Sequence, residues 1–208
     1  MSVIETLGNA FETERLIFAP IDPKSEVYMV TLDDMFAEPA LQALTYNMLL
    51  RPQSPRDIDF LVEQFDKALL GVAICLKPTG DRPRRTVIGT LWIGWGGLAG
   101  CYQQNRNADI GLILAKRHRG MGYGREALTW GVDWAFRHAN LHMLHHSVFE
   151  FNTTAIEMCK SLGFEQTGKL KEAFWMDRKY HDEFIFCMTE DDWEKHRQKQ
   201  TDDKHSDI

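Results

Sequence analysis

A basic, glycine-rich segment, residues 116–127, is the feature that most constrains the fold of this chain. It reads Lys-Arg-His-Arg-Gly-Met-Gly-Tyr-Gly-Arg-Glu-Ala, after an apolar run at 108–115 that is typical of a buried strand. Glycines tolerate positive φ and let a ligand approach the backbone. The apolar spacing that follows predicts a helix, whose first N–H groups form the positive end of its dipole. The segment therefore predicts a strand, an anion-binding loop and a helix, suited to a phosphate or pyrophosphate.

Composition limits the class of protein. The 208 residues are 44% hydrophobic, with 12 Phe and 6 Trp, which is enough for one domain with a sizeable core. The net charge of −6 argues against a general nucleic-acid binder. The four cysteines form no CxxC pair. The sequence therefore gives no indication of a zinc or redox site of that type. The N-terminus lacks the pattern of a signal peptide, and no apolar run approaches the roughly 18 residues of a membrane span. We therefore expect a cytoplasmic protein with no metal and no nucleic-acid or membrane partner.

Hydrophobic periodicity predicts a mixed α/β fold with a mostly antiparallel sheet, flanking helices and one βαβ unit. Strands are expected at 15–19, 72–76, 86–95, 108–115 and 142–149, and as a hairpin at 164–188. Helices are expected within 24–70, interrupted by Pro39, Pro52 and Pro55, then after the glycine loop, and from Asn152 to Gly163. Residues 1–10 are expected to be a flexible lead and residues 94–100 a loop. Residues 11–193 are expected to be the domain. A polar tail follows at 194–208, frayed from residue 195 onward.

Two kinds of protein place a glycine loop between a strand and a helix. Gly122-x-Gly124-x-x-Ala127 matches the dinucleotide-binding fingerprint of a Rossmann fold, and Glu150 ends the next strand. However, residues 116–119 separate the strand from the first glycine, where a Rossmann turn is tight. The chain then continues into hairpin strands rather than further βα units. This context makes the dinucleotide reading the weaker alternative.

A second reading rests on an ordered series of motifs. Arg119-x-x-Gly122-x-Gly124 follows Asp109-Ile-Gly, and Asn152-x-x-Ala155 and a Gly-Phe pair at 163–164 come later. In this order they resemble the GNAT superfamily of acyl-CoA-dependent N-acetyltransferases. The Thr-Glu-Arg-Leu sequence at 13–16 is similar to the opening of its branch that acetylates ribosomal-protein N-termini, as are Gly168-Lys-Leu, Tyr180-His-Asp and Trp193. The resemblance covers roughly residues 11–193 and implies a GNAT acetyltransferase domain there.

The resemblance implies acetyl-CoA as co-substrate and places its binding residues. The pyrophosphate is expected on the loop, and the pantetheine arm beside the strand at 110–114, where Gly111 would ease a bulge. Asn152 is expected to contact this arm or to cap the following helix, and Cys159 to line the arm or to fill the core. The sequence leaves open whether Arg117 and Arg125 contact phosphates or are only solvated. The implied cofactor-binding residues are Ile113, Leu114, Arg117, Arg119, Gly120, Met121, Gly122, Tyr123, Gly124, Arg125, Asn152 and Cys159.

Amine acetylation also requires proton transfer. A free alkyl amine with a pKa near 10 is only about one part in a thousand neutral at pH 7, so a base is expected. Asp109 is the first candidate, because some family members carry a catalytic Glu there; the hairpin carboxylates Asp182, Glu183 and Glu172 are alternatives. Cys159 stands where many members have a tyrosine acid, which leaves Tyr180 as the candidate acid. The histidines at 142, 145 and 146 lack the cysteine or carboxylate partners of a zinc set.

The expected activity is acetyl transfer from acetyl-CoA to a primary amine, by direct transfer in a ternary complex. The acceptor is a protein N-terminus or a small-molecule amine, and the protein is a monomer or a homodimer. No Cys-His arrangement suggests a covalent acyl-enzyme. A catalytically inactive acyl-CoA-binding protein of the same fold is the main alternative, supported by the cysteine at 159.

Overall fold

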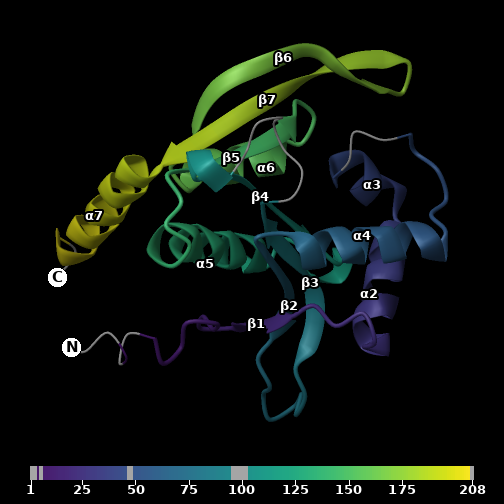
Figure 1. Ribbon diagram of the computed structural model, residues 1–208, viewed down its shortest axis with the longest axis horizontal. Coiled ribbons are helices and arrows are strands. Elements are labelled where there is room, and N and C mark those ends of the chain that lie inside the picture. Colours follow the sequence, from purple (N-terminus) through teal and green to yellow (C-terminus); the bar gives the residue numbers. More distant parts are fainter. Residues whose placement is uncertain (1–3, 5–6, 46–48, 95–102, 207–208) are drawn as a thin grey trace. The chain divides into compact units, whose positions relative to one another are not determined.

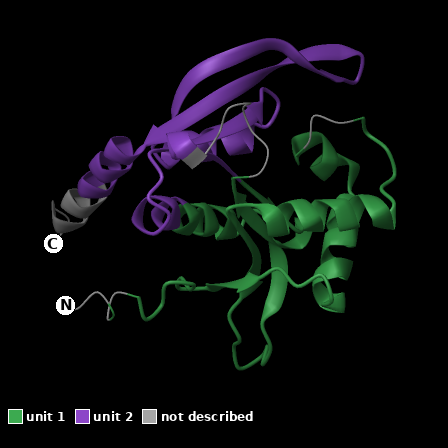
Figure 2. Cartoon of the chain, in the orientation of Figure 1, with its two compact units in different colours: residues 1–95, 111–131 green, residues 96–110, 132–208 purple. Residues whose placement is uncertain are grey.

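The chain folds into two compact units (Figures 1 and 2). The computed structural model describes residues 4, 7–45, 49–94 and 103–206. Unit 1 comprises residues 1–95 and 111–131, and unit 2 comprises residues 96–110 and 132–208. Strand β4 (Asn107–Leu114) and helix α5 (Tyr123–Arg137) each contribute to both units. The glycine-rich loop that joins this strand to this helix lies entirely in unit 1.

Unit 1 is a small sheet with three helices inserted between its first two strands. β1 pairs antiparallel with β2, and β2 with β3, which neighbours β4. The strands are β1 (Leu16–Pro20), β2 (Leu70–Leu76) and β3 (Thr86–Ile93), and the helices are α2 (Glu26–Phe36), α3 (Pro39–Thr45) and α4 (Pro55–Lys67). The prolines act as predicted, because Pro39 and Pro55 are the first residues of α3 and α4.

Helix α4 shows how the sequence pattern becomes packing. The N–H and hydroxyl of Ser54 both donate to Asp57 Oδ2, at 2.7 Å each, and so start the helix. Its predicted apolar stripe is buried at Ile58, Leu61, Val62 and Phe65. Phe65 stacks on Trp92 of β3 with ring centroids 4.9 Å apart. The helix therefore covers the core of unit 1 with one face.

Gly111 in β4 makes room for the Trp92 ring. A Cβ added at Gly111 would lie 2.4 Å from Trp92 Cζ2, inside van der Waals contact. We expect Gly111→Ala to lower the free energy of unfolding by about 1–3 kcal/mol, the usual cost of overpacking a core. Urea unfolding measures this. Gly80→Ala is the matched control, because a Cβ there meets nothing within 4 Å. Equal stability of the two variants would contradict this account of Gly111.

Unit 2 continues from the first half of β4. Residues 107–109 of β4 pair in parallel with β5, which pairs antiparallel with β7, and β7 pairs antiparallel with β6. The remaining elements are β5 (Met143–Phe149), α6 (Thr153–Ser161), β6 (Glu165–Met176), β7 (Lys179–Thr189) and α7 (Glu190–Ser206). Asp177 and Arg178 both have positive φ, 50° and 63°, and form the tight turn between β6 and β7 (Figure 1).

The fold class predicted from the sequence is confirmed. Hydrogen-bonded neighbours follow the order β1-β2-β3-β4-β5-β7-β6, a mostly antiparallel sheet of seven strands with flanking helices. In the described part of the chain, the parallel pairing is that of β4 with β5, joined by α5 as one βαβ unit. Of the predicted loop at 94–100, all but Gly94 lies outside the described residues. Of the predicted lead at 1–10, residues 1–3 and 5–6 lie outside them.

The C-terminal segment differs from the expectation. Residues 195–208 were expected to fray, but α7 extends to Ser206 and packs within unit 2. Trp193 is buried against Phe136, with ring centroids 5.4 Å apart, and its Nε1 donates to Asp133 at 2.8 Å. The His196 ring lies 2.9 Å from where a Cβ at Gly163 would be. Periodicity missed this helix because its polar sequence carries a single large apolar anchor.

Candidate functional site

The glycine loop has the backbone that its sequence predicts. After β4 ends at Leu114, a short 3₁₀ turn (Lys116–His118) leads to Gly120 and Gly122, whose φ angles are +73° and +82°. A Cβ at Gly120 would meet nothing within 4 Å, so the loop is open on that side. Helix α5 starts at Tyr123, and the first N–H groups of a helix have no acceptor within it. An anion carrying several oxygens fits this loop.

Arg119 holds the base of the loop. Its Nε donates to the carbonyl oxygen of Leu114 at 2.8 Å, and its two terminal nitrogens reach the Glu38 carboxylate at 2.8 and 3.1 Å. Glu38 lies between α2 and α3, 81 positions earlier in the chain. The guanidinium of this predicted coenzyme A-binding residue is therefore engaged with protein groups at the base of the loop.

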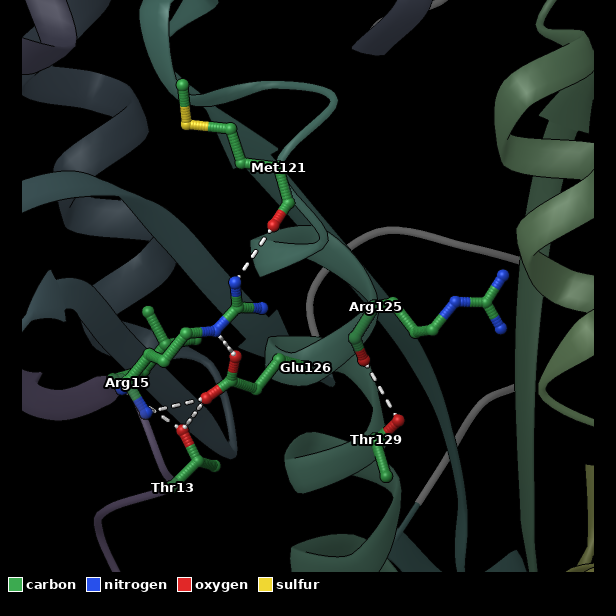
Figure 3. A network of polar contacts seen from close by, with 7 residues as sticks. Thr13, Arg15, Met121, Arg125, Glu126 and Thr129 are labelled. Carbon is green, nitrogen blue, oxygen red and sulfur yellow. Dashed lines mark hydrogen bonds and ion pairs between the residues drawn. The ribbon is translucent and has the colours of Figure 1, made fainter.

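Arg117 and Arg125, the other two arginines of the loop region, differ from Arg119 in their contacts. Arg117 Nε donates to His118 Nε2 at 3.1 Å, and burial, with the charges of Arg117 and Arg82, lowers the pKa of His118. A neutral His118 ring can accept this hydrogen bond. Arg125 lies in the first turn of α5, where its carbonyl accepts from Thr129 at 2.9 Å, and its side chain extends away from Glu126 (Figure 3). Arg117 and Arg125 are both exposed.

A polar network that the sequence did not predict ties the N-terminal segment to this loop (Figure 3). Thr13 Oγ1 and the Arg15 N–H donate to Glu126 Oε1 at 2.5 and 2.9 Å, and Arg15 Nε donates to Glu126 Oε2 at 2.7 Å. Arg15 Nη1 also donates to the Met121 carbonyl at 3.0 Å. Burial opposes ionisation, but these hydrogen bonds hold the pKa of Glu126 below its ordinary value. The Thr-x-Arg pattern at 13–15 was the sequence feature that could have pointed to this network.

Ile113 and Leu114 lie in unit 1 with buried side chains, so a ligand would meet their backbone groups. Ile113 belongs to the hydrophobic core of that unit. The Leu114 carbonyl already accepts from Arg119, and the next N–H, of Ala115, donates to Ile88 at 2.8 Å. Gly111, where a bulge was predicted, has another role in the structure, since the Trp92 ring occupies the space that its missing Cβ leaves.

Asn152 and Cys159 lie on α6 in unit 2. The Asn152 side-chain oxygen accepts from the Ala155 N–H at 3.2 Å and caps the helix, as one of the two roles expected for it. Cys159 is buried, and burial raises the pKa of its thiol to about 12. Burial therefore favours the protonated thiol over the thiolate, which is the nucleophilic form.

Asp109 and Tyr180 also belong to unit 2 but lie apart. Asp109 is buried and pairs in register with His145 of β5, whose Nδ1 lies 3.5 Å from Asp109 Oδ1. His145 in turn pairs with Cys187 of β7, and Tyr180 lies seven positions before Cys187, near the hairpin turn. At about 3.3 Å per residue this is roughly 23 Å of strand. One reacting group therefore cannot hydrogen-bond to both side chains.

Tyr180 is exposed and packs edge-on against Trp175, with ring centroids 4.8 Å apart. Among the alternative carboxylates, Asp182 is paired with Lys169 at 2.8 Å and accepts from the Glu172 N–H at 2.9 Å. These bonds, led by that from Lys169, lower the pKa of Asp182. Within the described residues there is no group of three or more His, Cys, Asp or Glu side chains suited to a metal ion.

The match to known proteins agrees with this geometry. The family model for the acetyltransferase (GNAT) domain matches residues 15–165, from Arg15 to the first residue of β6. The chain belongs to the GNAT acetyltransferase family. A spermidine N(1)-acetyltransferase of Vibrio cholerae is 31% identical over 78 residues, which are 38% of this chain and 45% of that protein. The [ribosomal protein uS5]-alanine N-acetyltransferase of Escherichia coli K12 is 25% identical over 84 residues, 40% of this chain and 43% of that protein.

The matched segment thus spans less than half the length of these curated relatives. Solved structures match over more of the chain. Spermidine N-acetyltransferase from Vibrio cholerae, in complex with CoA and spermine, superimposes with a TM-score of 0.70 at 16% identity, covering 87% of this GNAT chain and 99% of that one. A GNAT acetyltransferase from Bacillus anthracis gives 0.68 at 15% identity, covering 87% and 98%. These similarities establish the fold. No helix in the described part of the chain is long and apolar enough to cross a membrane.

Proposed function

We propose that this chain transfers an acetyl group from acetyl-CoA to a primary amine, by direct transfer in a ternary complex. The observation that carries the proposal is the loop from Arg119 to Gly124, with two left-handed glycines at the start of α5, in a chain of the GNAT family. Such a loop fits the pyrophosphate of coenzyme A, whose thioester supplies the activated acetyl group. The loop N–H groups hold the phosphates, and the β4 backbone guides the pantetheine arm.

Asp109 is the proposed general base. Its carboxylate is buried near the first end of β4, beside His145. A carboxylate that accepts the ammonium proton, directly or through one water, makes the amine nucleophilic. Asp182 is less suited to this task, because Lys169 and the Glu172 N–H already occupy its oxygens. Glu172 and Glu183 remain as alternatives for the variants described below.

Cys159 is buried, and burial raises the pKa of its thiol, which supports direct transfer over a covalent acyl-enzyme. The leaving thiolate has no assigned acid. Tyr180 on β7 lies too far from Asp109 on β4 for both side chains to act on one acetyl transfer. A thiol with a pKa near 8.5 leaves readily, so a dedicated acid contributes little. The acceptor class is a protein N-terminus or a small amine such as a polyamine, in keeping with the two kinds of named relative.

Ligand binding tests the proposal before any acceptor is known. We expect coenzyme A to raise the melting temperature, and NAD and NADP to leave it unchanged. At a concentration of 100 times its Kd, a ligand specific for the folded state adds about 2.7 kcal/mol of stability. Release of free CoA thiol from acetyl-CoA with a panel of N-terminal peptides and polyamines then measures catalysis. Binding without turnover would favour the inactive acyl-CoA-binding alternative, and equal stabilisation by NAD would refute the CoA assignment.

A further inference from the structure

The N-terminal segment follows one face of α5. Gly122, Glu126 and Trp130 are four residues apart, so they lie on one side of the helix and its start. Trp130 Nε1 donates to the Ala10 carbonyl at 2.8 Å, and Phe18 stacks on the same ring, with centroids 3.6 Å apart. These two contacts, at either end of the segment, hold Thr13 and Arg15 against the first turn of the helix.

Arg15 reaches the glycine loop itself. Its guanidinium donates to Glu126 and to the Met121 carbonyl and lies 4.5 Å from the centroid of the Tyr123 ring (Figure 3). Its Nη2 lies 3.2 Å from where a Cβ at Gly122 would be. By drawing the Met121 carbonyl toward itself, Arg15 fixes the orientation of the loop peptides. A guanidinium has five N–H donors, of which Glu126 and Met121 take two.

Charge gives Arg15 a second effect. Glu126 suits the first turn of a helix, because its charge complements the helix dipole. The same negative charge would repel an anion bound at the loop. Arg15 Nε lies 2.7 Å from Glu126 Oε2 and neutralises it, although the Arg15 side chain remains 43% exposed. The network therefore keeps the start of α5 attractive to phosphate.

We propose that Arg15 both positions the glycine loop and binds the pyrophosphate of coenzyme A. It orients the loop through Met121, offsets the charge of Glu126 and offers the N–H groups of Nη2 to a phosphate oxygen. This inference rests on the proposed function, because it requires coenzyme A as the ligand. It assigns a binding role to the segment before β1, more than 100 positions from the loop in sequence.

Calorimetry with coenzyme A and with pantetheine, which lacks the pyrophosphate, tests the role. Arg15→Ala should raise the Kd for coenzyme A about tenfold, the value of one charge-assisted hydrogen bond at a partly exposed site. It should leave the Kd for pantetheine unchanged. The Kd of Arg15→Lys for coenzyme A should lie between those of the wild type and Arg15→Ala, since lysine keeps the positive charge but lacks the planar set of guanidinium N–H donors. Adding Glu126→Gln to Arg15→Ala should recover part of the affinity, because it removes the unbalanced carboxylate.

Arg51→Ala is the matched control, because Arg51 is also exposed and pairs with Asp57 in the first turn of α4. It should leave both Kd values unchanged. The inference is overturned if Arg15→Ala binds coenzyme A as the wild type does, if it weakens coenzyme A and pantetheine equally, or if Glu126→Gln recovers nothing in the double variant. A wild-type protein that does not bind coenzyme A would instead refute the proposed function.

Discussion

Replacing Asp109 by asparagine is expected to lower kcat by about 10²–10⁴-fold, the usual effect of losing a general base. The Kd for coenzyme A should not change, because the predicted phosphate-binding loop lies beyond the other end of β4. Asparagine has nearly the same shape and retains the packing beside His145, 3.5 Å from Asp109 in the wild type. Steady-state rates with an accepted amine, together with calorimetry, measure the two effects. The fall in rate at low pH, where a carboxylate base is protonated, should disappear as well.

Asp133→Asn is the control for Asp109→Asn. Asp133 accepts from Trp193 Nε1 at 2.8 Å, a bond that the oxygen of an asparagine can still accept, so this variant removes a carboxylate charge in the same unit without touching the proposed base. We expect its kcat to match that of the wild type. An Asp109→Asn protein with full activity and an unchanged pH profile would exclude Asp109 as the base. Glu172→Gln and Glu183→Gln would then be the next variants to compare.

Gly122→Val should weaken the binding of coenzyme A by about 100-fold or more. A non-glycine residue held at φ +82° is strained by roughly 1–2 kcal/mol. The loop will relieve this by moving, which loses charge-assisted hydrogen bonds to phosphate worth about 1.5–3 kcal/mol each. The new Cβ would also lie 3.2 Å from Arg15 Nη2 and disturb the guanidinium. Calorimetry with coenzyme A measures the loss, and near-ultraviolet circular dichroism checks that the variant is folded.

Gly80→Val is the control for Gly122→Val, since Gly80 is in the turn before β3 and has nothing within 4 Å of its Cβ position. It should bind coenzyme A with the affinity of the wild type. Wild-type affinity in Gly122→Val would show that the loop is not the phosphate site. A Gly80→Val protein that also lost binding would mean that the effect of valine is not specific to the loop.

The elements around the predicted phosphate-binding loop could be read from the sequence because their signals are local. Positive φ was expected to be tolerated in the glycine loop, and Gly120 and Gly122 adopt it. Asn152 was expected to cap a helix and Gly163 to end it, and the structure places them so. Such positions depend on backbone conformation over a few residues, which the side-chain type largely determines.

The family was also accessible from the sequence, because its motifs occur in order along the chain. The match over residues 15–165 agrees with the motifs at 109–124 and 152–164. The C-terminal helix was not accessible, because α7 is polar along most of its length. Trp193 anchors this helix by packing against Phe136. The two residues are 57 positions apart in the sequence, so no local sequence pattern predicts their contact.

The sequence by itself therefore determined the fold class, the family and the glycine loop, because each depends on the spacing of nearby residues or on the order of motifs along the chain. What only the tertiary structure decided was the partner of each polar side chain. Arg119 donates to Glu38, which is 81 positions away in the sequence. Thr13 and Arg15 donate to Glu126, which is more than 100 positions away. An exposed arginine has the same local preferences wherever it occurs. Its partner is chosen by the packing of distant segments, which brings the N-terminal segment onto α5 through Trp130 and Phe18.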